Sequence, residues 1–469
     1  MRSSLYLIMA LLFMTSGCSM APKLDLQTPE LPASLEDANA TSKIDDKWWE
    51  AFGDARLNVL IEEALSNNDD LKLAISSVAL ARAALGLSEA ERYPTLNAGG
   101  SAIRQKTTGE SLSPFLAGVR YDTFILSASA AYEFDFWGRY KNAQEAAIAE
   151  LLASEADRET VRISLVSSVA ELYFTLVALQ RQISVTEETL HAYQESYDYR
   201  LRQYKHEAID ALTLEQAHAL YANAKLALAS LQETKVLSES ALAILLGKSP
   251  QALFEERAEF EEALPHALQI PANLSSRLLE QRPDIRASQE RLRASNALIG
   301  VARADYFPSI SLTGSAGLQS MELGNLLNSS AKTWSFGPSL SIPLFDFGRT
   351  KNRVKSAQEQ KNSALISYGK TVKNAFKEVY DSLKKIEISQ QKLRAQEEEK
   401  KALLQVFALS QKRFDSGYGT YLEVVEAKRG LLRSRVNMIS LNAELIINQI
   451  TLYKALGGGW RAAEAFEQE

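Results

Sequence analysis

The side chains that most often carry out catalysis are few in this chain and poorly spaced for it. The histidines are His191, His206, His218 and His266, and no two of them have a metal-ligand spacing. Gly247-Lys248-Ser249 matches the end of a phosphate-binding loop, but Leu242 stands where that loop requires its first glycine. No Gly-x-Ser-x-Gly nucleophile elbow is present. The sequence therefore predicts a protein that is not an enzyme and has neither a metal site nor a cofactor.

Cys18 is the only cysteine, and it lies where chemistry is expected. It follows the positive residue Arg2 and a short apolar run over residues 5–14, a combination typical of a secretory signal and too short to cross a membrane as a helix. The stretch Thr15-Ser16-Gly17-Cys18 resembles a lipobox, at which bacterial lipoproteins are cleaved and acylated, although Thr15 stands where leucine is usual. The alternative is a leftover cysteine in an ordinary signal peptide.

We therefore expect residues 1–17 to be removed and Cys18 to carry acyl chains such as palmitate, which would anchor the chain to membrane lipids. Ser19, and not aspartate, follows the cysteine, which by resemblance to such lipoproteins favours the outer membrane. Prolines among polar residues predict an extended, lipid-anchored linker over 18–47. The net charge of -6 argues against a nucleic-acid partner.

The chain repeats itself over roughly half its length. Leu60–Pro94 aligns without gaps with Leu274–Pro308, and Trp137-Gly138-Arg139 later matches Phe347-Gly348-Arg349. These matches predict repeat 1 over 48–247 and repeat 2 over 274–457, with a segment at 248–273 between them and a C-terminal tail at 458–469.

Each repeat is predicted to end in a hairpin of long helices. From Arg139 to Leu246 there is neither glycine nor proline, and two-thirds of that run would make a helix on the order of 100 Å. Such lengths indicate coiled-coil-like packing. The chain should reverse near 206–210 and near 417–419, and Thr420-Tyr421-Leu422-Glu423 matches a capping box that opens the return helix.

Residues of alternating polarity predict two strand pairs, at about 94–105 with 122–136 and at about 307–320 with 333–346. One apolar and one polar face fit a membrane β-barrel, but a half-buried soluble sheet shows the same pattern. The strand lengths and the aromatic residues at the strand ends favour the membrane.

Four strands cannot close a barrel, and an open sheet edge cannot lie in lipid, so a barrel shared between chains requires an oligomer. A dimer would supply eight strands, whose interior fills with side chains. A trimer would supply twelve, the smallest multiple expected to leave a pore.

Several motifs, in this order, resemble the TolC-like outer-membrane factor family, and more closely its lipoprotein branch, which serves tripartite efflux pumps. No single motif is decisive, but their order is highly specific and covers nearly the whole mature chain. The motifs are Trp48-Trp49 with Phe52, Asp54-Ala55-Arg56-Leu57, Gln281-Arg282-Pro283-Asp284-Ile285, Phe307-Pro308-Ser309-Ile310, Phe347-Gly348-Arg349 and Ala455-Leu456-Gly457-Gly458-Gly459-Trp460.

The resemblance implies a mixed α and transmembrane β fold. Four strands and long coiled-coil-like helices per protomer would form, in a homotrimer, a 12-stranded β-barrel in the outer membrane and a long α-helical barrel across the periplasm. An equatorial domain would draw on 248–273, the segment around 380–400 and the tail. The implied function is a passive exit duct for drugs or other toxic compounds. The implied partners are a periplasmic membrane-fusion adaptor, docked at the hairpin tips, and an inner-membrane transporter of the RND type.

The resemblance also implies a periplasmic gate at the start of the last long helix, at Leu422, Glu423, Glu426 and Arg429. Leu422 would form an apolar constriction. Glu423 and Glu426 share a helix face, so that a trimer would hold two rings of three carboxylates, and rings of acids select cations. Arg429 lies three residues beyond Glu426 and can pair with it, whereas Glu423 has an alternative role as the capping-box partner of Thr420.

A second reading is a periplasmic lipoprotein coiled-coil scaffold without a pore. It shares the signal sequence and the helices with the channel. It does not explain why amphipathic strand pairs stand at equivalent places in both repeats.

Overall fold

The structure is a computed structural model that describes residues 19–24, 45–110, 118–251, 264–265 and 282–460. The expected signal sequence, Cys18, and most of the 248–273 segment and of the tail lie outside these residues. The chain forms two compact units, and each draws on both repeats. We name them the strand unit, which contains 78–154 and 288–368, and the hairpin unit, which contains 155–251 and 369–460 among its described parts.

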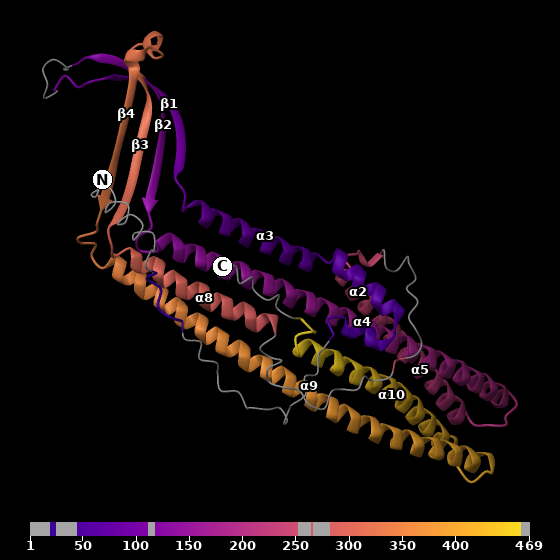
Figure 1. The fold of residues 1–469 in the computed structure, drawn as a ribbon. Coiled ribbons are helices and arrows are strands. Elements are labelled where there is room, and N and C mark those ends of the chain that lie inside the picture. Colours follow the sequence, from indigo (N-terminus) through magenta and orange to yellow (C-terminus); the bar gives the residue numbers. More distant parts are fainter. Residues whose placement is uncertain (1–18, 25–44, 111–117, 252–263, 266–281, 461–469) are drawn as a thin grey trace. The chain divides into compact units, whose positions relative to one another are not determined.

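The elements follow one another in two rounds of the same order (Figure 1). Four matched pairs have equal lengths: 22 residues in α3 and α8, 12 in β1 and β3, 67 in α4 and α9, and 35 in α5 and α10. Strands β2 and β4 differ, with 15 and 10 residues. The expected mixed fold is therefore confirmed. The bounds are η1 Trp48–Phe52, α2 Ala55–Asn67, α3 Asp69–Ala90, β1 Thr95–Lys106, β2 Arg120–Phe134, α4 Arg139–Lys205, α5 Ala211–Leu245, α8 Pro283–Ala304, β3 Ser309–Ser320, η3 Leu323–Asn325, η4 Ser329–Ala331, β4 Lys332–Ser341, α9 Arg349–Asp415 and α10 Tyr421–Ala455.

The strand unit holds one antiparallel sheet with the strand order β1-β2-β3-β4. Its centre joins the two repeats, because β2 pairs with β3 from Phe134 opposite Ile310 to Phe124 opposite Ser320. Strands β1 and β4 are each paired on one side only within the chain. Strand β4 ends at Ser341, before the expected end at 346, because Pro343 has no N–H with which to continue a ladder.

The register sorts the strand side chains onto two faces, since directly opposed residues point to the same side of a sheet. One face carries apolar rows, and the other carries small residues, most of them with hydroxyl or amide groups. Across the four strands, one apolar row is Leu96, Ala130, Gly314 and Phe336, and the adjacent polar row is Asn97, Ser129, Ser315 and Ser335. Within the polar row the Oγ atoms of Ser315 and Ser335 are 2.8 Å apart.

Among the described helices, α3 and α4 are long and apolar enough to cross a membrane by length and composition alone. The most apolar stretch of α4 is two-thirds buried inside the protein, as expected for a core helix of a folded chain. The corresponding stretch of α3 is only 11% buried. Helix α3 therefore carries an apolar surface that a single chain leaves largely uncovered.

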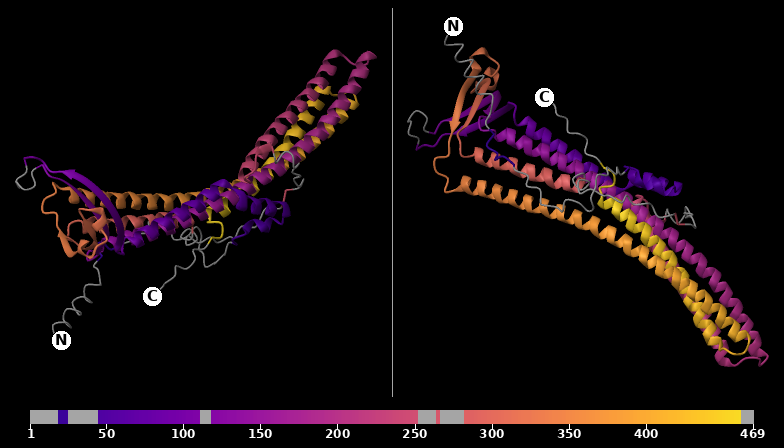
Figure 2. Two further views of the ribbon diagram at one scale, coloured as in Figure 1. Left: turned by 90° about the horizontal axis from the view of Figure 1, so that it is seen from above. Right: turned by 60° about the horizontal axis from the view of Figure 1, so that its bottom comes forward.

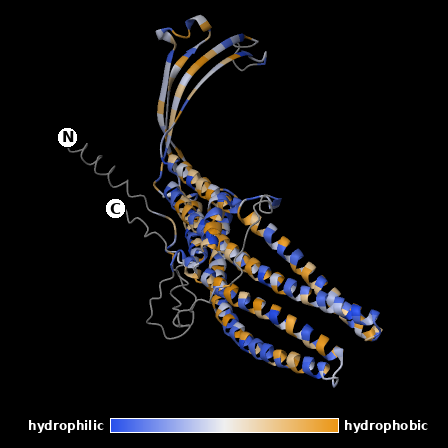
Figure 3. Ribbon diagram, turned by 90° about the vertical axis from the view of Figure 1, so that its right-hand side faces the viewer, coloured by the Kyte–Doolittle hydropathy of each residue, from blue (hydrophilic) through white to orange (hydrophobic). Residues whose placement is uncertain are grey.

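Both helical hairpins reverse where the sequence predicted, between α4 and α5 and between α9 and α10, and the views in Figure 2 show their loops at the same end of the hairpin unit. The two turns share one backbone conformation. Glu207 has a φ of 54° and Gly417, at the equivalent place, has a φ of 76°. Blue and orange segments alternate along the long helices in Figure 3, as amphipathic packing requires.

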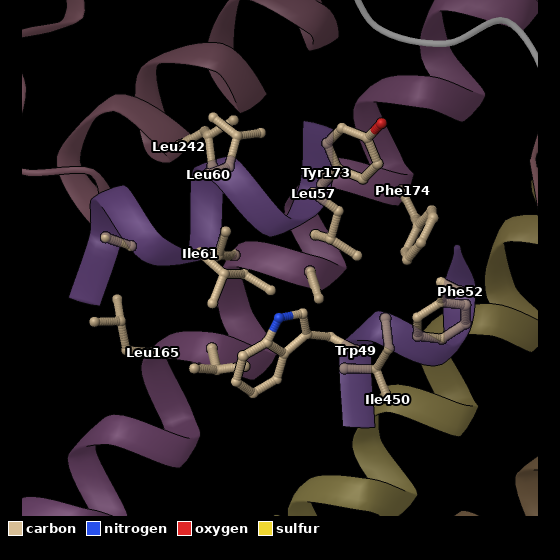
Figure 4. Close-up of a cluster of buried hydrophobic side chains, with 14 of the residues drawn as sticks. Trp49, Phe52, Leu57, Leu60, Ile61, Leu165, Tyr173, Phe174, Leu242 and Ile450 are labelled. Atoms are coloured by element: carbon tan, nitrogen blue, oxygen red, sulfur yellow. The ribbon is translucent and has the colours of Figure 1, made fainter. Parts of the chain in front are cut away.

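A buried aromatic and aliphatic cluster in the hairpin unit explains the first family-like motif (Figure 4). Trp49, Phe52 and Leu57 pack there with residues of α4, α5 and α10. Asp54 caps α2 by accepting hydrogen bonds from the backbone N–H groups of residues 56 and 57, and it also accepts one from the hydroxyl of buried Tyr173 at 2.5 Å. A buried carboxylate is thus satisfied by three donors, which is the condition for keeping it in a core.

The residues that follow Cys18 lie against the strand unit. Ser19 Oγ donates to Asn142 Oδ1 at 2.7 Å, and Asn296 Nδ2 donates to the carbonyl oxygen of Pro22 at 2.8 Å. Gly300 makes room for this segment, since a Cβ atom there would lie 2.5 Å from Asn142 Nδ2 and 2.8 Å from the backbone nitrogen of Ala21. Helices α4 and α8 thus hold residues 19–24, which belong to the strand unit.

Gly247, which ends α5, offers a test of the packing in the hairpin unit. Its φ is +68°, and a Cβ atom would overlap the carbonyl oxygen of Asn67. We expect Gly247→Ala to lower the free energy of unfolding by about 2 kcal/mol, because both backbone strain and steric overlap oppose the substitution. Gly369→Ala is the control, since nothing outside its chain neighbours and the nearby backbone of α9 lies within 4 Å of its Cβ position. Equal melting temperatures of the two variants in detergent, measured by circular dichroism, would contradict this expectation.

Candidate functional site

The expected gate residues lie at the start of α10, beside the turn that closes the second hairpin. Thr420 caps the helix, and its Oγ1 accepts a hydrogen bond from the backbone nitrogen of Glu423 at 3.4 Å. Leu422 points away from the hairpin core and is 47% exposed. The carboxylate of Glu426 lies 3.1 Å from Nη1 of Arg429, so the ion pair expected from the spacing is present.

Glu423 differs from the expectation. Its carboxylate lies 3.7 Å from Nε of Arg413, in the last turn of α9, and does not return to the backbone nitrogen of Thr420. The hydrogen bond from the backbone nitrogen of Thr420 to the carboxylate of Glu423, which would complete the expected capping box, is therefore not formed. The carboxylate remains partly exposed and bridges the two helices that meet at the turn.

An arginine of α4 packs against two aromatic rings at the start of α10 and the end of α9. The guanidinium of Arg200, on α4, lies 4.5 Å from the ring centre of Tyr421 and 5.0 Å from that of Phe414. Tyr421 is buried, and its hydroxyl is 3.0 Å from Oγ of Ser196. The sequence analysis did not find this cluster, because Arg200 and Ser196 lie more than 200 residues from Tyr421 and only the fold brings them together.

Tyr193 belongs to the same apolar cluster, which contains residues of α4, α5 and α10. Burial raises the pKa of the Tyr193 phenol to about 12, although the nearby positive charges of Arg429 and Arg435 act in the opposite direction. The side chain of Tyr193 thus packs as a neutral phenol between α5 and α10.

A cavity of about 750 Å³ lies between α5 and α10 directly beyond the gate segment. Glu426, Arg429 and Arg433 line it from α10, and Asn223 and Thr234 line it from α5. The structure thus brings Glu426 and Arg429 to one groove, which apolar side chains of both helices also line. Leu422 and Glu423 are not among the residues that line it.

The tip of the first hairpin has the same backbone and different chemistry. Asp210 takes the place of Thr420 and caps α5 by accepting a hydrogen bond from the backbone nitrogen of Thr213 at 2.9 Å. Hydrogen bonding from Thr213 lowers the pKa of that carboxyl group. Thr213 and Gln216 stand where the second hairpin has Glu423 and Glu426, so that the paired acids occur at one tip only.

The described residues include no group of three or more histidine, cysteine, aspartate or glutamate side chains placed to hold a metal ion. Two other features of the described residues bear on function. One is the sheet with one polar face, and the other is the tip of the second hairpin, where two glutamates each lie within 4 Å of an arginine.

Comparison with known proteins gives consistent results. The family model described as outer membrane efflux protein matches residues 60–248 and 274–458. The cation efflux system protein CusC of Escherichia coli is 36% identical over 459 residues, which cover 95% of this chain and 96% of CusC. The toluene efflux pump outer membrane protein TtgC of Pseudomonas putida is 32% identical, covering 98% of this chain and 96% of TtgC. The probable outer membrane lipoprotein SilC of Salmonella typhimurium is 33% identical, covering 96% and 97%.

Solved structures agree with the sequence relatives. The CmeC outer membrane channel of Campylobacter jejuni superposes with a TM-score of 0.90 at 28% identity, over 95% of this chain and 96% of that one. A structure of CusC gives a TM-score of 0.81 at 33% identity, over 94% of this chain and the whole of that one.

The raised pKa of Tyr193 predicts that the free energy of unfolding falls at alkaline pH. An unfolded chain ionises tyrosine near pH 10, whereas the folded chain keeps Tyr193 neutral to about pH 12. The contribution of this group is therefore constant below about pH 10 and is lost as the pH rises to about 12, by about 2 kcal/mol. Urea unfolding in detergent at pH 8 and pH 11 should show a smaller loss for Tyr193→Phe than for the parent. Tyr418→Phe, at a ring that is 83% exposed, should behave like the parent; an equal pH dependence of all three would refute the assignment.

Proposed function

The chain belongs to the outer membrane efflux protein family, and on this premise we propose that it acts as the homotrimeric outer-membrane channel of a tripartite efflux pump. It provides a passive exit duct from the periplasm to the outside. The observation that carries the proposal is the four-stranded sheet with one apolar and one polar face, open at both edges and joined to two long helical hairpins.

The sheet sets the architecture of the duct. The unpaired edges of β1 and β4 must be satisfied in lipid, and three chains close a barrel of twelve strands. The apolar rows then face the lipid. The rows of serine, threonine, asparagine and glycine then line the duct. Their small hydroxyl and amide groups would keep the duct hydrated without forming a binding site for one kind of solute.

The partners follow from the position of the hairpins. A periplasmic membrane-fusion adaptor docks on the hairpin tips, and an inner-membrane transporter of the RND type supplies the substrate. One of the relatives named above belongs to a cation efflux system and another to a toluene efflux pump. This chain is 36% identical to the first and 32% identical to the second over nearly its whole length, so channels of one fold serve pumps with different substrates. Substrate choice therefore lies mainly with the transporter, and the channel itself carries out no catalysis.

The periplasmic end of the duct is closed by Leu422, Glu423, Glu426 and Arg429. In a trimer, Leu422 forms a ring of three apolar side chains and the two acids form two rings of carboxylates. The ion pairs of Glu423 with Arg413 and of Glu426 with Arg429 reduce the repulsion within each ring, so that the closed state is tolerated. Opening exposes the acids to solvent and to cations.

Substitution at Glu426 tests the gate. Glu426→Ala removes three carboxylates from the constriction and leaves Arg429 without its partner. We expect a higher single-channel conductance in planar bilayers and a reversal potential, under a potassium chloride gradient, that shifts toward lower cation selectivity. Gln216→Ala, at the equivalent place in the first hairpin, is the matched control and should change neither quantity. Unchanged conductance and selectivity in Glu426→Ala would exclude this residue from the gate.

Acylation of Cys18 completes the proposal. Residues 19–24 are held on α4 and α8, so an acyl chain on the preceding cysteine would be tethered at a fixed place on the strand unit. Intact mass spectrometry of the mature protein should show that residues 1–17 are absent and that acyl chains are present on Cys18. An unmodified Cys18 would end the anchor hypothesis.

The Cys18→Ser variant separates the channel from the alternative, a lipoprotein scaffold without a pore. A scaffold loses its only membrane attachment in this variant and becomes extractable without detergent. A barrel keeps its apolar strand face and still requires detergent.

A further inference from the structure

Charged side chains lie on the apolar face of the sheet, at the ends of β1 and β2 that are farthest from α3 and α4. In the β1–β2 ladder Arg104 stands opposite Asp122, and Lys106 stands opposite Arg120. Both pairs are an even number of residues from the apolar row that contains Leu96, so their side chains point to the apolar face. This end of the face therefore carries three positive charges and one negative charge.

The length of β2 places these charges at the level of membrane headgroups. From Phe134, near α4, to Phe124 the apolar face runs for ten residues, or about 33 Å along the strand. A strand tilt of about 40° reduces this length to about 25 Å across the membrane, which is the height of the apolar band of outer-membrane barrels. Asp122 and Arg120 follow directly beyond this band. Charges on the lipid face of a barrel cost little free energy there, because headgroups and water solvate them.

The outermost pair of the ladder is unfavourable for the chain alone. Lys106 and Arg120 are both exposed, and like charges directly opposite each other on one face of a ladder repel. Neither side chain forms an ion pair with a residue that the structure describes. An anion between the two side chains would turn this repulsion into two favourable contacts.

Arg104 adds a fixed donor one row away. Its Nε and Nη2 atoms donate to the two carboxylate oxygens of Asp122 at 2.6 and 2.7 Å. This bidentate pair fixes the plane of the guanidinium and leaves its Nη1 group without a partner among the described residues. The side chain of Arg104 is 79% exposed. Because successive rows on one face are about 7 Å apart, Arg104, Lys106 and Arg120 can contact one phosphorylated headgroup together.

The second repeat shows that a strand pair of this kind forms without the charged cluster. With the repeat offsets of 214 residues for β1 and β3 and of 210 for β2 and β4, the β3–β4 ladder has the same register as the β1–β2 ladder. The four equivalent places hold one basic residue in place of three: Leu318, Ser320, Ser330 and Lys332. Strand pairing therefore does not account for the three basic residues of repeat 1.

An apolar hollow lies on the same face, nearer to the helices. It has a volume of about 560 Å³ and lies between two adjacent rows of the apolar face. Small side chains such as Ala98 and Ala128 form its floor, and Trp334 and Phe336, which are 77% and 69% exposed, lie beside it. Ala98 is six residues from Arg104, or about 20 Å along β1, a distance that a headgroup and its acyl chain can span. A phosphate that belongs to a lipid therefore gains a second contact, which a free phosphate lacks.

We propose that Arg104, Lys106 and Arg120 bind the phosphate groups of a lipopolysaccharide molecule in the outer leaflet of the outer membrane, with an acyl chain in the hollow. The proposal rests on the barrel of the proposed function, in which the apolar face meets lipid and the helices lie in the periplasm. The charged end of β1 and β2 is then at the outer surface, where the lipid A disaccharide of the glycolipid carries its phosphates. Each chain of the trimer holds one such molecule.

Lipid binding by the purified trimer in detergent tests the site. Native mass spectrometry during titration with bisphosphorylated lipid A should show up to one bound lipid per chain. The double variant Lys106→Gln with Arg120→Gln should bind lipid A about tenfold more weakly, because two positive charges are removed. The matched control is Lys370→Gln with Lys373→Gln, the same change of charge at two exposed residues of α9, which should bind lipid A like the parent. Equal binding by the parent and by Lys106→Gln with Arg120→Gln would refute the site.

Other ligands identify the source of the phosphate. Phosphatidylglycerol, which has one phosphate and no disaccharide, should bind the parent about tenfold more weakly than lipid A. Equal affinity for the two lipids would overturn the assignment to lipopolysaccharide. Displacement of lipid A by millimolar inorganic phosphate would indicate a site for free phosphate and would overturn the assignment as well.

Arg120→Glu separates lipid binding from the stability of the ladder. It places an acid opposite Lys106, so that an ion pair replaces the repulsion and trimers without lipid should melt at a higher temperature than the parent. Lipid A should raise the melting temperature of the parent and leave that of this variant unchanged. A rise of equal size in both would overturn the proposal. A chain that is monomeric in detergent would contradict the proposed function, whereas a trimer that fails to discriminate in these experiments refutes the lipid site alone.

Discussion

The backbone groups at the two free edges of the sheet impose the constraint on which the rest of this structure depends. An N–H or C=O group left unpaired in hydrocarbon costs several kcal/mol, and β1 and β4 each present a row of them. One chain cannot satisfy both edges. In the proposed trimer, a second copy of the chain would pair with each free edge, and the apolar surface that α3 exposes in a single chain would be available for contact with it.

The two repeats meet in the middle of the sheet. Strand β2 of repeat 1 pairs with β3 of repeat 2, and beside this ladder Trp137 stacks on Phe307 and donates a hydrogen bond to the carbonyl oxygen of Pro308. Because the two repeats share one sheet, neither repeat forms its strand pair independently of the other.

Periodicity and repetition made most of this fold predictable from sequence. The absence of glycine and proline after Arg139 predicted the long helices, and the alternation after Phe124 predicted a strand, because both patterns are local. The candidate site was less predictable. The spacing of Glu426 and Arg429 on one helix predicted their ion pair. The pairing of Glu423 with Arg413 depends on how α9 and α10 meet at their turn, and the contact of Arg200 with the ring of Tyr421 depends on how α4 packs against α10. No local sequence pattern encodes either arrangement.

If the proposed gate is correct, the divergence of the two hairpin tips places regulation in one repeat. Both turns use the same backbone, so the helical ends can alternate around a ring of six hairpins. Only the second tip carries Glu423 and Glu426, and each acid has an arginine within 4 Å in its own chain. In the proposed trimer, a closed ring of such tips would be held by apolar contact and by carboxylates whose charge is compensated within each chain. Such a ring would need no strong bond between chains, so that a docked partner could open it at a low cost in free energy.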